Sequence, residues 1–331
     1  MGEKNSKVPG LVVGIGASAG GLAALKEFVA SLTVDSGMAF VIVQHLAPDH
    51  KSMMDDLLSR VTEVPVSTAE DDVSIAPNHI YVTPPGVYME LDDNDSLRLV
   101  DTDDQLGGRQ AIDHFFRSLA KRDSGGVAGI VLSGSGSDGT AGLREIKAAG
   151  GVTLAQSPEV AEHASMPDSA IRANVIDDVL PAGEMFATLK QFADHPAGLR
   201  QKWADEESKS EMLKGSELED VVPSLEEVTS ILKANENFDL RHYKPRTIQR
   251  RIARRMSLAN ISSFHDYLEK LRESGEERSL LTRDLLINVT DFFRDQAAFD
   301  FIAEETIPKI LDTLGPGKEV RVWVAGCASG E

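Results

Sequence analysis

The sequence has little of several residue types, and each shortage excludes a class of protein. Its only cysteine is Cys327, which excludes a disulfide framework and fits a reducing compartment. No uninterrupted apolar stretch approaches the ~20 residues that span a bilayer. The first apolar run is cut by Gly14 and Gly16 before it reaches the length of a signal peptide. We therefore expect a cytoplasmic protein with no segment inserted in a membrane.

Positive charge is also scarce. The 331 residues carry 34 Lys and Arg against 53 Asp and Glu, a formal net charge of −19. Such a surface repels nucleic acid and anionic membranes, so nucleic acid is not an expected partner. About two-fifths of the chain is apolar (41%), which is enough to bury a substantial core, and the length suits roughly two domains.

Residues 9–193 alternate short Val- and Ile-rich runs with amphipathic helical patterns. This alternation predicts an α/β fold, a doubly wound and mostly parallel sheet with helices on both faces. Proline, asparagine and aspartate punctuate residues 73–100, which are typical of an antiparallel hairpin insert at a sheet edge. The expected strands are 11–16, 39–44, 80–84 and 129–134, and the expected helices are 22–32, 52–61, 111–122 and 141–150.

The second half differs in character. Residues 194–222 are polar and strongly charged, which predicts a linker. Residues 223–314 read as a small all-α domain, with Pro223 and Ser224 as a helix start signal. Residues 315–331 contain one further strand pattern, EVRVWVAG.

The stretch LVVGIGASAGG, residues 11–21, fits two different motifs. From Gly14 it is G-x-G-x-x-A, a dinucleotide-binding turn, and from Gly16 it is G-x-S-x-G, an elbow that presents the nucleophile Ser18. A dinucleotide site needs an acidic residue at the end of the next strand, where the sequence instead has Gln44 and His45. An NAD-dependent enzyme is therefore the less favoured alternative.

Three predicted strand ends carry a serine, a histidine and an aspartate. Ser18, His45 and Asp138 each follow an apolar run, and parallel strands bring their carboxyl ends to one edge of the sheet. A serine hydroxyl becomes a nucleophile when an imidazole takes its proton, and a carboxylate fixes the imidazole tautomer. Each residue also has an ordinary structural explanation: a loop serine, a hydrogen-bonded histidine, and a turn or helix-capping aspartate. The coincidence of all three favours a serine hydrolase, with Gly20 and Gly21 allowing close approach of the substrate.

Five segments together resemble the CheB-type chemotaxis methylesterase domain, over roughly residues 9–190. They are VGIGASAGGLAALKEF, VIVQHLAPDH, AEDDVSIAPNHIYVTPPGVYMEL, GIVLSGSGSDGTAGLREIKAAGG and AEHASMPDSAI. The resemblance implies a doubly wound α/β hydrolase that removes methyl esters from glutamates of chemoreceptors and deamidates receptor glutamines. It implies Ser18 as nucleophile, His45 as base and Asp138 as orienting acid. It also implies an oxyanion and substrate loop at Ala19, Gly20, Gly21 and Met166, and no cofactor for the esterase.

The chain departs from that family at three positions near the implied site. Ala19 stands where the family has threonine, Ser135 where it has methionine, and Asp168 where it has a basic residue. The family's receiver domain is not expected here because the sheet pattern begins at residue 9. These departures motivate the alternative of a catalytically idle receptor-docking scaffold for the downstream domain.

The second half resembles the start of a CheR-type receptor methyltransferase. The resemblance rests on FDLRHYKPRTIQRRIARRM, SSFHDYLEKL, LLINVTDFFRD and VRVWVAGCASGE, and the whole is similar to a fused methylesterase–methyltransferase. It implies S-adenosylmethionine as the cofactor of the full methyltransferase, contacted by Asn288, Thr290 and Arg294, with Gly326 and Gly330 in the first glycine-rich loop. Because the chain stops inside that loop, we expect it to be part of a longer protein and not to methylate by itself.

One local exception to the acidic composition lies in this half. Arg246, Arg250, Arg251, Arg254 and Arg255 cluster within three helical turns. The cluster is either a solvated face or a docking face for an acidic receptor helix. Nucleic acid is disfavoured because no aromatic residues interleave with the arginines. The expected partners are methylated chemoreceptor cytoplasmic helices, together with other signalling proteins.

Overall fold

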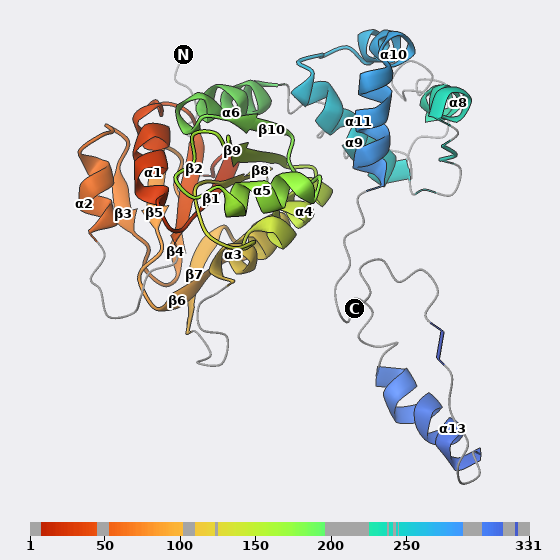
Figure 1. The fold of residues 1–331 in the computed structure, drawn as a ribbon, viewed down its shortest axis with the longest axis horizontal. Coiled ribbons are helices and arrows are strands. Elements are labelled where there is room, and N and C mark those ends of the chain that lie inside the picture. Colours follow the sequence, from red (N-terminus) through yellow and green to blue (C-terminus); the bar gives the residue numbers. More distant parts are fainter. Residues whose placement is uncertain are drawn as a thin grey trace, which may run out of the picture. The chain divides into compact units, whose positions relative to one another are not determined.

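The structure is a computed structural model, and it describes residues 8–44, 53–101, 110–122, 125–195, 225–236, 238–240, 243, 245–286, 300–313 and 322–323. The chain forms two compact units, residues 1–287 and residues 288–331 (Figure 1).

A seven-stranded sheet forms the centre of the first unit. Its order is β10-β9-β8-β1-β2-β5-β3, and its pairings are parallel. The predicted fold class is therefore confirmed. Strands covered on both faces read as continuous apolar runs, and β1 and β8 are buried along their whole length. The strands are β1 (Leu11–Ala17), β2 (Met38–Gln44), β3 (Val66–Thr68), β5 (His79–Val82), β8 (Gly126–Val131), β9 (Val152–Gln156) and β10 (Asp178–Leu180).

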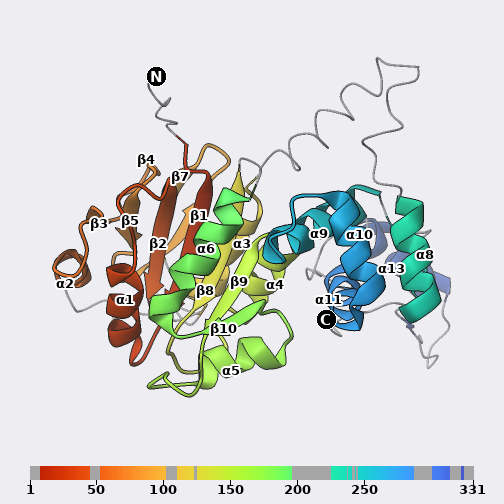
Figure 2. The same ribbon diagram turned by 90° about the horizontal axis from the view of Figure 1, so that it is seen from above.

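Helices cover both faces of this sheet, and alternate residues of β1 serve the two cores. Leu11, Val13 and Ile15 pack in one core with α1 (Gly21–Ala30), α2 (Met54–Ser59) and α6 (Met185–Asp194), which follows the 3-10 turn η1 (Ala182–Glu184). Figure 2 shows α6 in front of the strands of this sheet. Val12 packs in the other core. That core contains α3 (Ala111–Ala120), α4 (Thr140–Ala148) and α5 (Ser165–Arg172), and Figure 1 shows α3 and α4 on the side opposite α1.

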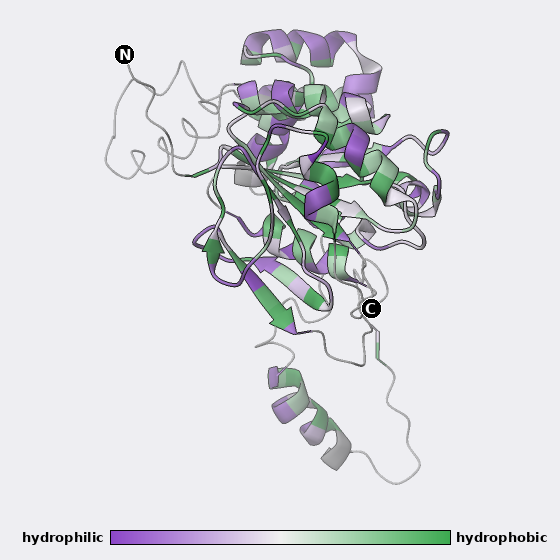
Figure 3. Ribbon diagram, turned by 90° about the vertical axis from the view of Figure 1, so that its left-hand side faces the viewer, coloured by the Kyte–Doolittle hydropathy of each residue, from purple (hydrophilic) through white to green (hydrophobic). Residues whose placement is uncertain are grey.

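The predicted hairpin insert forms a sheet of its own. β4 (Val73–Ser74), β6 (Val87–Leu91) and β7 (Ser96–Asp101) pair antiparallel in the order β4-β7-β6. The predicted strand 80–84 lies within this segment, and as β5 it joins the main sheet beside β2. The hydropathy colouring of Figure 3 shows the strands of the main sheet as predominantly hydrophobic.

Gly14 and Gly16 lie inside β1 and have a packing role. A side chain at Gly14 would come within 2.8 Å of Phe116, and one at Gly16 within 2.4 Å of Ile112, both residues of α3. These two glycines let α3 lie directly against the strand. A dinucleotide fingerprint needs its glycines in the turn after the strand, so the structure does not support the NAD alternative.

Residues 225–286 form the helical part of the first unit. The helices are α8 (Leu225–Glu236), α9 (Pro245–Leu258), α10 (Phe264–Glu273) and α11 (Gly275–Leu285), as the sequence predicts. Ser263 and Ser274 cap α10 and α11 by accepting backbone N–H groups of Asp266 and Glu277. Their shared core includes Val228, Leu232, Ile252, Met256 and Tyr267. Of the predicted linker, residues 196–222 lie outside the described residues.

The described part of the second unit contains a π-helical turn, η2 (Ile302–Thr306), followed by α13 (Ile307–Thr313). Phe301, Ile302, Ile307 and Ile310 are exposed. Val322 and Trp323, the described residues of the predicted strand 319–326, are exposed and outside any strand. Among the helices that the structure describes, none is long and apolar enough to cross a membrane.

Candidate functional site

Ser18 lies in the turn between β1 and α1. The strand ends at Ala17, the helix begins at Gly21, and Gly20 between them has the left-handed conformation with φ of 69°. A side chain at Gly20 would also come within 2.8 Å of Glu162 Cβ. The Ser18 N–H donates to the Ser133 carbonyl at 3.0 Å, and the Ser18 carbonyl accepts from Gly21 N–H at 3.0 Å. The sequence G-x-S-x-G therefore forms a tight strand–turn–helix elbow.

The end of β8 supports this elbow from the side. The buried hydroxyl of Ser133 donates to the Ala19 carbonyl at 2.9 Å and accepts the His163 N–H at 2.9 Å. A side chain at Gly134 would lie 3.0 Å from Ser18 Cβ and 2.4 Å from Met166 Sδ. Ser133 and Gly134 thus hold the serine turn against the loop before α5, and the sequence motifs did not identify Ser133 for this role.

Met166 supports the site without exposure to solvent. Its side chain is fully buried against Gly134, and its N–H donates to the Gly134 carbonyl at 3.0 Å. The predicted site residues therefore differ in their exposure to solvent. Ser18 is half-buried and Ala19 is exposed, whereas Met166 is buried beneath them. Asp168, one of the altered wall residues, is 3.8 Å from Arg172 across one turn of α5.

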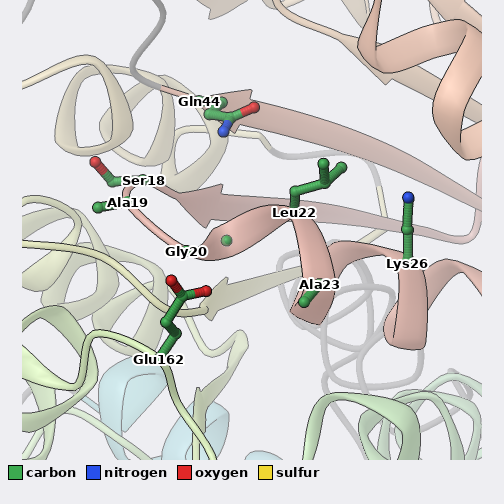
Figure 4. A pocket seen from close by; sticks show the side chains of 9 residues that line it. Ser18, Ala19, Gly20, Leu22, Ala23, Lys26, Gln44 and Glu162 are labelled. Carbon is green, nitrogen blue, oxygen red and sulfur yellow. The ribbon is translucent and has the colours of Figure 1, made fainter.

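A pocket of about 570 Å³ opens at the serine turn. Figure 4 shows Glu162 on one side of the turn and Gln44 on the other, with Lys26 farther along α1. Among the residues that the structure describes, the buried Oε1 of Gln44 has no hydrogen-bond partner. The sequence motifs did not identify Lys26 or Glu162. The lining residues are Ser18, Ala19, Gly20, Gly21, Leu22, Ala23, Lys26, Gln44 and Glu162.

Asp138 follows β8 in the loop that leads to α4. It is 8% exposed, and its carboxylate accepts the backbone N–H groups of Ile112 at 3.0 Å, Asp113 at 2.9 Å and Gly139 at 2.9 Å. Gly139 has φ of 87°, and a side chain there would come within 2.9 Å of Ile112. The aspartate is therefore held by the amino end of α3 and by the glycine after it.

His45 lies outside the described residues, and so do Asn288, Thr290, Arg294, Gly326 and Gly330. The chain positions still relate Ser18 and His45. Ala17 and Gln44 are register partners in the parallel pair β1–β2, and each immediately precedes one of the two residues. In the described residues, no group of three or more His, Cys, Asp or Glu side chains could hold a metal ion.

The expectation that the arginine cluster on α9 is a solvated or docking face is wrong for three of its five members. Arg251, Arg254 and Arg255 are buried, so these three form neither a solvated face nor a docking face. Arg254 binds the carboxylates of Asp177 and Asp284 and donates from Nε to the Gly151 carbonyl at 2.8 Å. Arg255 forms a two-bond pair with Glu277, at 2.9 and 2.8 Å. Composition alone does not show that these cations have internal partners.

Comparison with known proteins places the chain in a family. Residues 13–189 match the CheB methylesterase family, residues 223–286 the all-alpha domain of CheR methyltransferase, and residues 288–331 the SAM binding domain of CheR methyltransferase. The crystal structure of the Thermotoga maritima CheB methylesterase catalytic domain is similar, with a TM-score of 0.52 and 29% sequence identity. That match covers 56% of this chain and 99% of that one.

Several relatives agree with this match. A putative protein-glutamate methylesterase/protein-glutamine glutaminase of Leptospira interrogans is 32% identical over 54% of this chain and 93% of its own length. A protein-glutamate methylesterase/protein-glutamine glutaminase of Photorhabdus laumondii is 35% identical over 51% of this chain. An uncharacterised 104.1 kDa protein of Rhodobacter capsulatus is 34% identical over 84% of this chain. The chain spans 49% of the length of the Photorhabdus protein and 30% of that of the Rhodobacter protein. The chain belongs to the CheB methylesterase family, and its second half matches CheR methyltransferase domains.

Proposed function

We propose that the first half of the chain is a serine esterase that hydrolyses glutamate methyl esters, and the corresponding glutamine amides, on receptor helices in chemotaxis-type signalling. The observation that carries the proposal is the strand–turn–helix elbow, which presents Ser18 at the mouth of a pocket. The family membership supplies the substrate class. The proposed location is the cytoplasm, because the proposed partners are the cytoplasmic helices of chemoreceptors.

In the proposed mechanism, Ser18 Oγ attacks the ester carbonyl while His45 takes its proton. The proton then passes to the departing methanol, and water cleaves the acyl-enzyme with His45 again as the base. The negative oxygen of the tetrahedral intermediate would accept N–H groups of the turn, from Ala19 and Gly20. Gly21 lines the pocket, but its N–H already donates to Ser18 carbonyl, so it is not assigned as an oxyanion donor.

The pocket chemistry is compatible with an ester substrate and an acid product. A methyl ester or primary amide is neutral, whereas the hydrolysed glutamate is anionic. Of the two charged lining residues, Glu162 lies beside Gly20 and Lys26 lies farther along α1, so repulsion by the Glu162 carboxylate would act closer to the turn and favour release of that product. The amide of Gln44 offers a hydrogen-bonding group to the substrate from the opposite side of the turn.

For the second half we propose the role of a receptor methyltransferase in the complete protein, with S-adenosylmethionine supplying the methyl group. Asn288, Thr290, Arg294 and Gly326 are the proposed contacts. They lie outside the described residues, so no step of the reaction is assigned to them.

The test of the esterase measures methanol released from a receptor-helix peptide that carries a glutamate γ-methyl ester. Ser18→Ala and His45→Gln should each reduce the rate by on the order of 10⁴ to 10⁶, because the nucleophile and its base act as a unit. A fluorophosphonate probe should label the wild type at Ser18, and His45→Gln should reduce that labelling. Full methanol release by Ser18→Ala would refute the assignment. A folded wild type that neither releases methanol nor takes the label would favour the receptor-docking scaffold.

A further inference from the structure

A second buried carboxylate lies beside the proposed triad acid and has no part in the mechanism above. Asp113 is in the first turn of α3 and is 8% exposed, as is Asp138. Its Oδ1 accepts the N–H of Gly142 in the first turn of α4, at 2.7 Å. Asp138 in turn accepts N–H groups from Ile112 and from Asp113 itself.

The two aspartates therefore cap each other's helices. Asp138, just before α4, binds the amino end of α3, and Asp113, in α3, binds the amino end of α4. The residues at the N-cap positions of these helices, Gln110 and Gly139, make no side-chain cap hydrogen bond. The exchanged carboxylates satisfy N–H groups that would otherwise lack acceptors, in a place where helix dipoles favour negative charge.

The helices α3 and α4 pack closely where they cross. A side chain at Gly142 would come within 2.4 Å of Phe116 Cβ and 3.1 Å of the Asp113 carbonyl. Ile112, whose N–H binds Asp138, fills the space beside Gly16, two residues before Ser18. The position of Asp138 is thus linked through α3 to the strand that carries the nucleophile.

The charge of Asp113 also interacts with the Asp138 carboxylate. Burial raises the pKa of Asp113 to about 6, the Gly142 N–H acts in the opposite direction, and the charge of Asp138 raises the pKa further. Arg117, one turn along α3, opposes that rise. Arg117 itself pairs with Glu145 of α4 at 3.3 Å, and Glu90 of β6 pairs with His114 at 2.7 Å. Near neutral pH, above this pKa, Asp113 is therefore mostly ionised and adds negative charge where α3 meets α4.

We propose that Asp113 is a positioning residue of the esterase: through the contact between α3 and α4 it fixes the Asp138 carboxylate, and it adds a second negative charge beside that carboxylate. The inference rests on the proposed function, in which Asp138 orients His45. If Asp138 orients His45, the added charge of an ionised Asp113 would stabilise the imidazolium form of that histidine, which is the form that gives its proton to the leaving group.

The test compares wild type, Asp113→Asn, Asp113→Ala and the control Asp178→Asn. Asparagine keeps an acceptor for Gly142 N–H and removes only the charge, whereas alanine removes both. Asp178 is an exposed carboxylate of β10, the edge strand of the main sheet. Asp178→Asn also removes one negative charge, but β9 and β8 separate β10 from β1, the strand that precedes Ser18. The readouts are the NMR titration of the His45 ring, assigned with His45→Gln, and the pH profile of kcat/KM for methanol release from the γ-methyl ester peptide.

Asp113→Asn should lower the His45 pKa, and with it the acid limb of kcat/KM, by about half a pH unit. Asp113→Ala should also lower kcat, because Asp138 loses its fixed position. Asp178→Asn should match the wild type in both readouts. If Asp113→Asn, folded by circular dichroism, shows the wild-type His45 titration, the role of Asp113 is overturned while the esterase assignment stands. Methanol release that survives in Ser18→Ala would instead overturn the esterase assignment.

Discussion

At the scale of single residues, the serine turn needs glycine at Gly20 and Gly134, because a side chain at either position would clash with its neighbours. Ser18 is placed by Gly134 on one side and by the left-handed Gly20 on the other, and Met166 fills the space beneath Gly134. The sequence points to Ser18 because it fits the G-x-S-x-G spacing with Gly16 and Gly20 and because a histidine and an aspartate follow two other predicted strands. Sequence motifs do not identify Ser133 or Glu162, because these residues reach the turn only through the folding of distant loops.

Asp113 also makes a prediction about stability. A carboxyl group whose pKa rises from 3.8 to about 6 on folding stabilises the folded state at low pH, and this contribution disappears as pH rises through about 6. Asp113→Asn removes this pH dependence. Its free energy of unfolding, relative to wild type, should increase by about 2 kcal/mol between pH 4.5 and pH 8. Urea denaturation of both proteins at the two pH values measures the difference, and a pH-independent difference would contradict the burial of this charge.

At the scale of elements, glycines determine how closely α3 approaches its neighbours. Gly14 and Gly16 of β1 accept α3 on one side, and Gly142 of α4 accepts it on the other. The sequence shows Gly14 and Gly16 as parts of two overlapping motifs and leaves two explanations open for them. The tertiary structure decides between them, because it shows which side chains fill the space that each glycine leaves.

Gly142→Ala should therefore separate α3 from α4. The added methyl group would lie within 2.4 Å of Phe116 Cβ, and such overpacking costs about 1–3 kcal/mol. The thermal unfolding midpoint should fall, and labelling of Ser18 by the fluorophosphonate probe should slow as Asp138 shifts. Gly183→Ala is the matched control, since its added methyl group would come no closer than 3.8 Å to the Glu27 carbonyl. Equal midpoints for the two variants would argue against a close α3–α4 contact.

At the scale of the molecule, the acidic chain keeps several of its cations inside. Arg254 is fully buried and connects Asp177, which precedes β10, with Asp284 of α11. Lys147 of α4 lies 2.9 Å from Asp177 and 3.7 Å from Asp284. Although burial opposes ionisation, Arg254 and Lys147 hold the pKa of Asp177 well below its usual range. This ion cluster joins segments that match different families, residues 13–189 and 223–286.

Arg254→Ala should destabilise the protein by about 3–5 kcal/mol, because it leaves buried carboxylates with too few partners. The contribution of Asp177 is present above pH 3.8 and is lost as pH falls below it, so the destabilisation should shrink in acid. Chemical denaturation at neutral and acidic pH measures both effects. Arg172→Ala, which removes an arginine with a side chain 82% exposed, should have little effect. A loss as small in Arg254→Ala would show that the cluster contributes little.

The sequence by itself determined the α/β class, the helical second half and the family resemblance, because hydrophobic periodicity and local motifs are properties of contiguous residues. It also predicted that Ser18 follows the first strand, and the structure places it in the turn directly after Ala17. Only the tertiary structure decided the role of the arginine cluster, the separate sheet of β4, β6 and β7, and the paired capping by Asp113 and Asp138. The ion and capping contacts join residues far apart in the chain, 25 positions for Asp113 and Asp138 and 103 for Arg254 and Gly151. Packing decides the partner of such a charge, so no local sequence pattern records it.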